Sequence, residues 1–231
     1  MIRMPCEFSL THYEEILEKV KDRAGTATER KDIILAHDID IFPNYALQMA
    51  SLEHKYGIKA TYYILLHSEW YNALSPENMA VWKQIGELGH ELALHYDGNY
   101  DSELQTIHAA FCAMIKTESI NISQHLVGIT PDIHIPPTLQ DRAALVKQYS
   151  YKYIADSGGW WRNGCICTHA DERLLFVCHP VWWVKSENPF DKVKVDAYAV
   201  IDRARNFWVE MVNEHRKQQY QQKVPVATRS A

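Results

Sequence analysis

The chain has 231 residues, of which 47% are hydrophobic and 23% charged, and this composition is that of a globular protein able to bury a substantial core. Its formal net charge is -5 and it contains no basic block, so nucleic acid is not an expected partner. No apolar run reaches the length of a membrane span, and residues 1–15 lack the apolar core of a signal peptide.

The number and spacing of the cysteines indicate the redox environment of the protein. There are five, an odd number, and Cys165 and Cys167 form a CxC pair without a second pair at zinc-ribbon spacing. We interpret all five as reduced thiols, which predicts a cytoplasmic protein. Nothing in the sequence indicates an oligomeric state.

The first elements have clear boundaries. A capping box from Thr11 to Glu14 predicts a helix over about 11–24. The apolar run 33–36 then predicts a buried strand over 32–40. Pro43 and Gly57 stand where a helix is expected to begin and end, which predicts a helix over 43–57.

The rest of the chain continues this alternation. Further strands are expected over 59–66, 90–97, 120–128, 151–161 and 173–183. Further helices are expected over 75–88, 104–116, 138–149 and 196–217, with a proline-broken loop at 129–137. Alternating strands and helices predict a parallel sheet with right-handed crossovers in a single domain, residues 1–231, with the first and last helices packed on it.

Ionisable side chains stand at the carboxyl ends of the expected strands. They are Asp38, Asp40, His95, His125, Asp156 and His179. In an α/β barrel these ends converge on one bowl. Two carboxylates as close as Asp38 and Asp40 repel one another unless a cation lies nearby, although each could instead cap the following helix. One Asp and two His around a metal with an open position form a common hydrolytic arrangement.

Five short motifs occur in the order found in one known family. They are HDID at 37–40, GHELALHYD at 89–97, ISQH at 122–125, YIADSGGWW at 153–161 and CHPVWW at 178–183. On these motifs, residues 8–215 resemble the polysaccharide deacetylase (NodB-homology) superfamily, in particular its divergent HDxD branch, which includes O-antigen deacetylase-like proteins. The resemblance implies a distorted (β/α) barrel of the polysaccharide deacetylase type.

The resemblance also implies roles for individual residues. Asp38 would be the general base that activates water on the metal, and Asp40 and His95 would be metal ligands. His179 would be the general acid that protonates the leaving amine. Asp156 and Trp160 would orient neighbouring groups and shape the substrate pocket.

The sequence departs from the family pattern at two places. The family has a second histidine four residues after the one matched by His95, whereas this chain has Asn99. We expect His125 to be the third ligand because it ends the next predicted strand; His134 and Asn99 are the alternatives, and His134 is also a candidate for substrate binding. The Arg-containing third motif of the family is missing.

The implied function is hydrolysis of a C–N amide bond with a divalent metal, Zn²⁺ first among the candidates. The expected reaction removes an acetyl or formyl group from an amino sugar, and a nucleotide-sugar or other glycan precursor is the expected substrate. Two alternatives remain open: an amidohydrolase of the same fold that acts on a non-sugar amide, and a member that binds metal or ligand without catalysis.

Three further groups have structural interpretations. His37 precedes Asp38 and should point to the opposite face of its strand, into the core, and His90 stands at a strand start far from the converging ends. The Trp pairs at 160–161 and 182–183 suit either core packing or stacking against a sugar.

Overall fold

The computed structural model describes residues 6–97, 103–126, 133–161, 163–184, 209–210 and 213. The chain divides into two units, Met1–Pro189 and Phe190–Ala231, and the elements discussed below all belong to the first. The predicted helix at 196–217 lies outside the described residues except for three helical positions, 209, 210 and 213. Within the described ranges, no helix combines the length and apolarity needed to cross a membrane.

The first unit is built on one parallel sheet. Seven strands lie in the order β6-β5-β4-β3-β2-β8-β7, β1 pairs with β2 outside this row, and every pairing is parallel. The strands are β1 Ala24–Gly25, β2 Ile33–Ile39, β3 Thr61–Leu65, β4 Glu91–Tyr96, β5 Asn121–Gln124, β6 Gln140–Asp141, β7 Lys152–Ala155 and β8 Leu174–Cys178. The sheet is curled into a half-barrel, so the α/β class is confirmed and the architecture is compatible with a distorted barrel.

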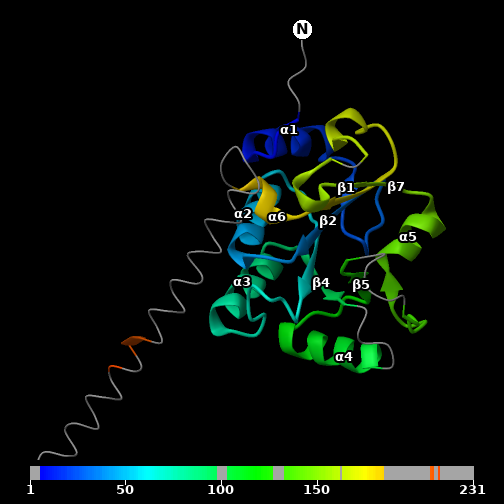
Figure 1. Ribbon diagram of the computed structural model, residues 1–231. Coiled ribbons are helices and arrows are strands. Elements are labelled where there is room, and N and C mark those ends of the chain that lie inside the picture. The colour runs from blue at the N-terminus through cyan, green and yellow to red at the C-terminus, as the bar shows by residue number, and fades with distance from the viewer. Residues whose placement is uncertain are drawn as a thin grey trace, which may run out of the picture. The chain divides into compact units, whose positions relative to one another are not determined.

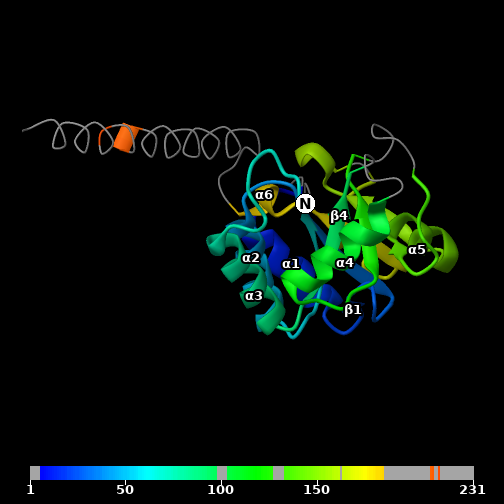
Figure 2. The same cartoon turned by 90° about the horizontal axis from the view of Figure 1, so that it is seen from below.

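Six α-helices and two short 3-10 helices accompany the strands in the described part of the first unit. They are α1 Leu10–Val20, α2 Pro43–Lys55, α3 Pro76–Glu87, α4 Leu104–Ile115, α5 Arg142–Tyr149, α6 Pro180–Trp183, η2 Ser157–Gly159 and η3 Ile166–Thr168. Helices α2 and α3 lie on one side of the unit and α5 lies on the other, as Figure 1 and Figure 2 both show.

The central strand β2 separates the two faces of the sheet. Its residues are all buried, and the alternation of a strand divides them. Ile33, Leu35 and Ile39 join the large core cluster that includes residues of the outer helices. Ile34 and Ala36 belong to a smaller cluster on the inner face. Asp38 has the parity of the inner face, so it emerges inside the half-barrel.

His37 has the opposite parity and lies in the outer core, as the alternation predicts. Its Nε2 donates to Oε1 of buried Glu53 on α2 at 2.6 Å. Glu53 also accepts hydrogen bonds from the hydroxyls of Tyr13 and Tyr62, at 2.5 and 2.6 Å. His90 is buried in the same region, with Nε2 2.9 Å from the Ala50 carbonyl. Both histidines are therefore core residues.

Several boundaries differ from the prediction. The helix expected from Thr138 begins at Arg142, because residues 140–141 pair with β5 as a short strand and Asp141 caps the helix by accepting from the Ala143 N–H at 2.8 Å. The strand expected over 173–183 ends at Cys178, because Pro180 lacks the N–H that a strand would use and starts α6 instead.

The first helix and the fifth predicted strand are also shorter than expected. Helix α1 ends at Val20 rather than near residue 24, and Ala24 with Gly25 pairs with β2 instead. The strand expected over 151–161 ends at Ala155, and Gly158 and Gly159 have φ angles of 67° and 74°, outside the extended region of a regular strand.

Candidate metal and catalytic site

Three side chains meet at the carboxyl end of the sheet. Asp40 follows β2, His95 lies near the end of β4, and His125 follows β5. His95 Nε2 lies 3.2 Å from His125 Nδ1 and 3.4 Å from Asp40 Oδ1, and the distance from His125 Nδ1 to Asp40 Oδ1 is 3.3 Å. The three atoms form a nearly equilateral triangle, although 85 residues separate the outermost two side chains in the sequence.

The triangle has the dimensions of three ligands on a tetrahedral metal. Zinc bonds of about 2.0–2.1 Å to nitrogen and oxygen place neighbouring ligand atoms about 3.3 Å apart. The set of Asp40, His95 and His125 is therefore a candidate metal group. A donor set of two imidazoles and one carboxylate suits Zn²⁺ and similar divalent ions.

Hydrogen bonds around the triangle prepare its atoms as ligands. His95 Nδ1 donates to the Ser123 carbonyl at 2.8 Å, so the lone pair is on Nε2, which faces the other two groups. The His125 backbone N–H donates to the Tyr96 carbonyl at 2.6 Å, which places His125 beside β4. Asp40 Oδ1 is buried and accepts no hydrogen bond of good geometry from the described residues. A cation would satisfy that oxygen.

The carboxylate of Asp40 is kept in its charged form. Burial alone would raise its pKa, but His125, His95 and His179 outweigh that effect and hold the pKa well below its usual range. Conversely, burial would lower the pKa of His125, and the adjacent Asp40 raises it above the ordinary value.

Asp38 lies beside the triangle and is paired with a buried arginine. Its Oδ2 is 3.7 Å from His95 Nε2. Arg142, at the start of α5, donates from Nη1 to Oδ1 at 2.5 Å and from Nη2 to Oδ2 at 2.8 Å. The guanidinium also lies over the Tyr63 ring, 5.2 Å from its centre. Burial would raise the pKa of Asp38, but the charge of Arg142 lowers it overall.

His179 approaches from the other side of Asp40. It follows β8, and its Nε2 is 3.7 Å from Asp40 Oδ2. Its Nδ1 donates to fully buried Asp156 at 2.5 Å, and its backbone N–H donates to the same carboxylate at 3.0 Å. Burial would lower the pKa of His179, but Asp156 outweighs burial and raises the pKa to about 9. Asp156 also accepts from Trp183 Nε1 at 2.6 Å.

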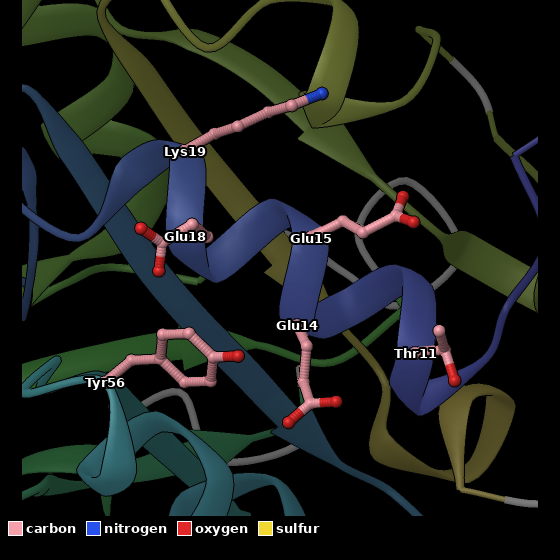
Figure 3. A pocket seen from close by; sticks show the side chains of 6 residues that line it. All are labelled: Thr11, Glu14, Glu15, Glu18, Lys19 and Tyr56. Atoms are coloured by element: carbon pink, nitrogen blue, oxygen red, sulfur yellow. The ribbon is translucent and has the colours of Figure 1, made fainter.

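These groups open into one cavity of about 1010 Å³. Its lining includes the triangle with Asp38, Arg142 and His179, and its walls add aromatic and apolar side chains such as Tyr153, Trp182, Ile133 and Ile135. A second hollow of about 530 Å³ lies over α1 and Tyr56, away from these groups, and is lined by three glutamates, Thr11 and Lys19 (Figure 3).

The structure brings most of the predicted site residues together. Asp38, Asp40, His95, His125 and His179 all line the cavity, and Asp156 lies directly behind His179. His134 is exposed and does not line the cavity, although its neighbours Ile133 and Ile135 do. Trp160 is 66% exposed and lies outside the lining, where Trp182 is found instead. Asn99 falls outside the described residues.

Arg142 is the residue that sequence reasoning missed. The pattern placed it inside a helix starting at Thr138, where an arginine is ordinarily solvated. The available signal was positional: Arg142 directly follows the end of a strand, as Asp40, His125 and His179 do. That strand, β6, has only two residues and shows no periodicity.

Comparison of the sequence with known protein families and curated proteins identifies no relative. No family model matches the chain, and the search of curated proteins finds no match either. The polysaccharide deacetylase resemblance therefore stays a prediction that rests on the motifs.

Proposed function

We propose that this protein is a metal-dependent hydrolase of a C–N amide bond, which removes an acetyl or formyl group from an amino sugar or a nucleotide-sugar or glycan precursor. The observation that carries the proposal is the triangle of Asp40, His95 and His125, flanked by the Asp38–Arg142 pair and the His179–Asp156 pair. A group of metal ligands, a buried carboxylate and a protonated imidazole can together supply the Lewis acid, the general base and the general acid of a metal-dependent amide hydrolysis.

Asp40, His95 and His125 would hold the metal. A bound Zn²⁺ or similar ion would supply Lewis-acid polarisation of the amide carbonyl and acidify a water molecule. Three protein ligands leave a coordination position for substrate or water, as catalytic sites require.

Asp38 would accept the proton of the attacking water. Its depressed pKa keeps the carboxylate ionised at neutral pH, and the two hydrogen bonds from Arg142 fix its orientation. The ion pair with Arg142 weakens Asp38 as a base. Asp38 therefore suits a water molecule whose pKa has already been lowered, as a bound metal ion would do.

His179 would donate a proton to the leaving amine. Because Nδ1 donates to Asp156, the proton available for transfer is on Nε2, which points toward Asp40. A pKa of about 9 keeps the imidazole protonated at neutral pH. Asp156 therefore orients the acid and maintains its charge.

The cavity is large enough for an amino sugar with a further substituent. Its volume of about 1010 Å³ is at the upper end of ordinary ligand pockets, which span roughly 300–1,000 Å³. Trp182 and Tyr153 contribute aromatic side chains to the lining, and Gln124 and Ser157 contribute polar ones. This mixture suits a sugar better than a purely apolar amide.

The test is release of acetate or formate from a panel of N-acyl amino sugars and nucleotide-sugars by the full chain. We expect release with added Zn²⁺, loss with a chelator, and a drop of about 10²–10⁴-fold for Asp38→Asn. Asp22→Asn, at an exposed position after α1, is the matched control.

Each outcome separates the alternatives. Release from acylated amines alone would favour the non-sugar amidohydrolase. Metal binding with no release from any compound would favour a non-catalytic member and end the enzyme proposal. Equal rates for Asp38→Asn and the wild type would refute the role of Asp38.

A further inference from the structure

A second group of metal-ligating side chains lies away from the cavity, beside α1. Cys6 precedes α1, His12 lies in its first turn, and Cys165 and Cys167 belong to the η3 region of the loop between β7 and β8. Every pair of their ligand atoms lies within 4.8 Å. Cys165 and Cys167 form a CxC pair without a second such pair in the sequence. The fold brings two further candidate ligands to them, Cys6 and His12, from the N-terminal part of the chain.

The distances suit one ion better than a covalent link. Cys6 Sγ is 3.3 Å from Cys167 Sγ, and His12 Nε2 is 3.3 Å from Cys165 Sγ. Tetrahedral zinc with bonds of about 2.3 Å to sulfur and 2.0–2.1 Å to nitrogen separates two sulfurs by about 3.8 Å and a sulfur from a nitrogen by about 3.6 Å. A disulfide would require sulfurs about 2.05 Å apart. The two pairs would have to widen by about 0.5 and 0.3 Å to fit an ion, and all the ligand atoms lie within 4.8 Å of one another.

His12 is oriented as a ligand. Its Nδ1 lies 3.2 Å from Glu15 Oε2, one turn further along α1, so the carboxylate can accept the Nδ1 proton and leave the Nε2 lone pair toward the sulfurs. A carboxylate behind the ring of a histidine ligand is a recurrent arrangement at zinc sites. Figure 3 shows Glu15 extending from α1 in a different direction from Glu14.

The surroundings shield the group in part and hold the segments in place. Cys165 is buried and the other three side chains are half-buried. Trp161 Nε1 donates to the Cys6 carbonyl at 3.0 Å, and its ring stacks on Phe8 at 4.9 Å. The His12 ring is stacked with Trp183 at 6.4 Å. Four protein ligands would leave no coordination position for a substrate on a tetrahedral ion.

We propose that Cys6, His12, Cys165 and Cys167 form a structural zinc site that joins the segment before α1 to the loop between β7 and β8. Three thiolates and one imidazole are a soft donor set that selects zinc over magnesium or calcium. Figure 1 shows α1 beside this loop.

The zinc site would also support the catalytic groups. The loop begins at Asp156, and Trp183, which donates to Asp156, packs against His12. Loss of the ion would therefore loosen the residues that orient His179. This consequence concerns positioning only, and the zinc site does not depend on the proposed hydrolysis.

Metal content and cobalt spectra test the proposal on the full chain. We expect two zinc ions per wild-type chain and one in either His125→Ala or the double variant Cys165→Ser/Cys167→Ser. After Co²⁺ substitution, His125→Ala should keep the near-ultraviolet sulfur-to-cobalt charge-transfer band, and the double serine variant should lose it. Cys112→Ser, a half-buried thiol on α4, is the control and should keep both ions and the band.

A milder variant guards against misfolding. Cys6→Ser, in the His125→Ala background, removes one half-buried ligand ahead of α1. We expect its zinc affinity to fall at least tenfold and the zinc-dependent rise in melting temperature to shrink, while the melting temperature in chelator stays the same. Undiminished stabilisation by zinc, a cobalt spectrum without the charge-transfer band, or a Cys6–Cys167 disulfide in zinc-treated protein would each overturn the proposal.

Discussion

Replacement of Arg142 by methionine tests the buried ion pair of the candidate site. The guanidinium makes two charge-assisted hydrogen bonds to Asp38, of 2.5 and 2.8 Å, and both side chains are almost fully buried. Methionine fills similar space but leaves the carboxylate without its cation. Breaking a buried pair in this way costs about 3–5 kcal/mol of unfolding free energy.

The expected loss can be measured by urea denaturation and by melting. For a domain of this size, each kcal/mol corresponds to about 2–4 °C, so Arg142→Met should lower the melting temperature by about 6–20 °C. Arg30→Met is the control: Arg30 makes an exposed hydrogen bond to the Tyr149 hydroxyl, and we expect a change within about 0.5 kcal/mol.

The double variant Asp38→Asn/Arg142→Met isolates the charge. With no carboxylate left unpaired, it should recover most of the stability lost in Arg142→Met, so the two changes should not add. A loss below about 1 kcal/mol for Arg142→Met, or simple additivity in the double variant, would refute the reasoning.

The pH dependence gives an independent check of the same pair. In the wild type the pKa of Asp38 is lowered, so its contribution to stability is present above the unfolded pKa and is lost as pH falls through the folded one. Without Arg142, burial should raise that pKa. The stability difference between wild type and variant should therefore narrow as pH falls from 7 toward 4, and a constant difference would contradict this account.

The contacts of Glu53, Asp156 and His125 each predict the effect of a single substitution. Glu53→Gln should lower the free energy of unfolding by about 3 kcal/mol at pH 7. Because the pKa of Glu53 is lowered despite its burial, the wild type should lose this advantage as pH falls below about 4.5. Denaturation between pH 6 and 3 measures this, and parallel stability curves for wild type and variant would contradict it. Asp156→Asn should lower kcat about 10²–10⁴-fold. Because Asp156 raises the pKa of His179, the alkaline limb of the pH–rate profile should move to lower pH in this variant, and an unmoved limb would exclude the Asp156 contact as its cause. His125→Ala should abolish metal-dependent hydrolysis and weaken metal binding, measured by titration, at least tenfold. His134 is exposed, so His134→Ala should behave as wild type. Equal effects of the two substitutions would count against the assigned ligand set.

Local pattern alone was sufficient for the framework of this protein. The apolar run of β2 and the Pro43 start of α2 were predicted within two residues because burial and capping depend on nearby residues. The same reasoning predicted that Asp38, Asp40, His95, His125 and His179 would gather, since the carboxyl ends of parallel strands meet at one edge.

Tertiary structure alone decided the partners of those residues. Arg142 reaches Asp38 across 104 residues, and Cys6 meets Cys167 across 161. Neither contact leaves a periodic signal in the sequence, because each depends on how segments remote along the chain pack together. The short strand β6, two residues long, likewise exists only because β5 pairs with it, and it is this pairing that positions Arg142 at the start of α5.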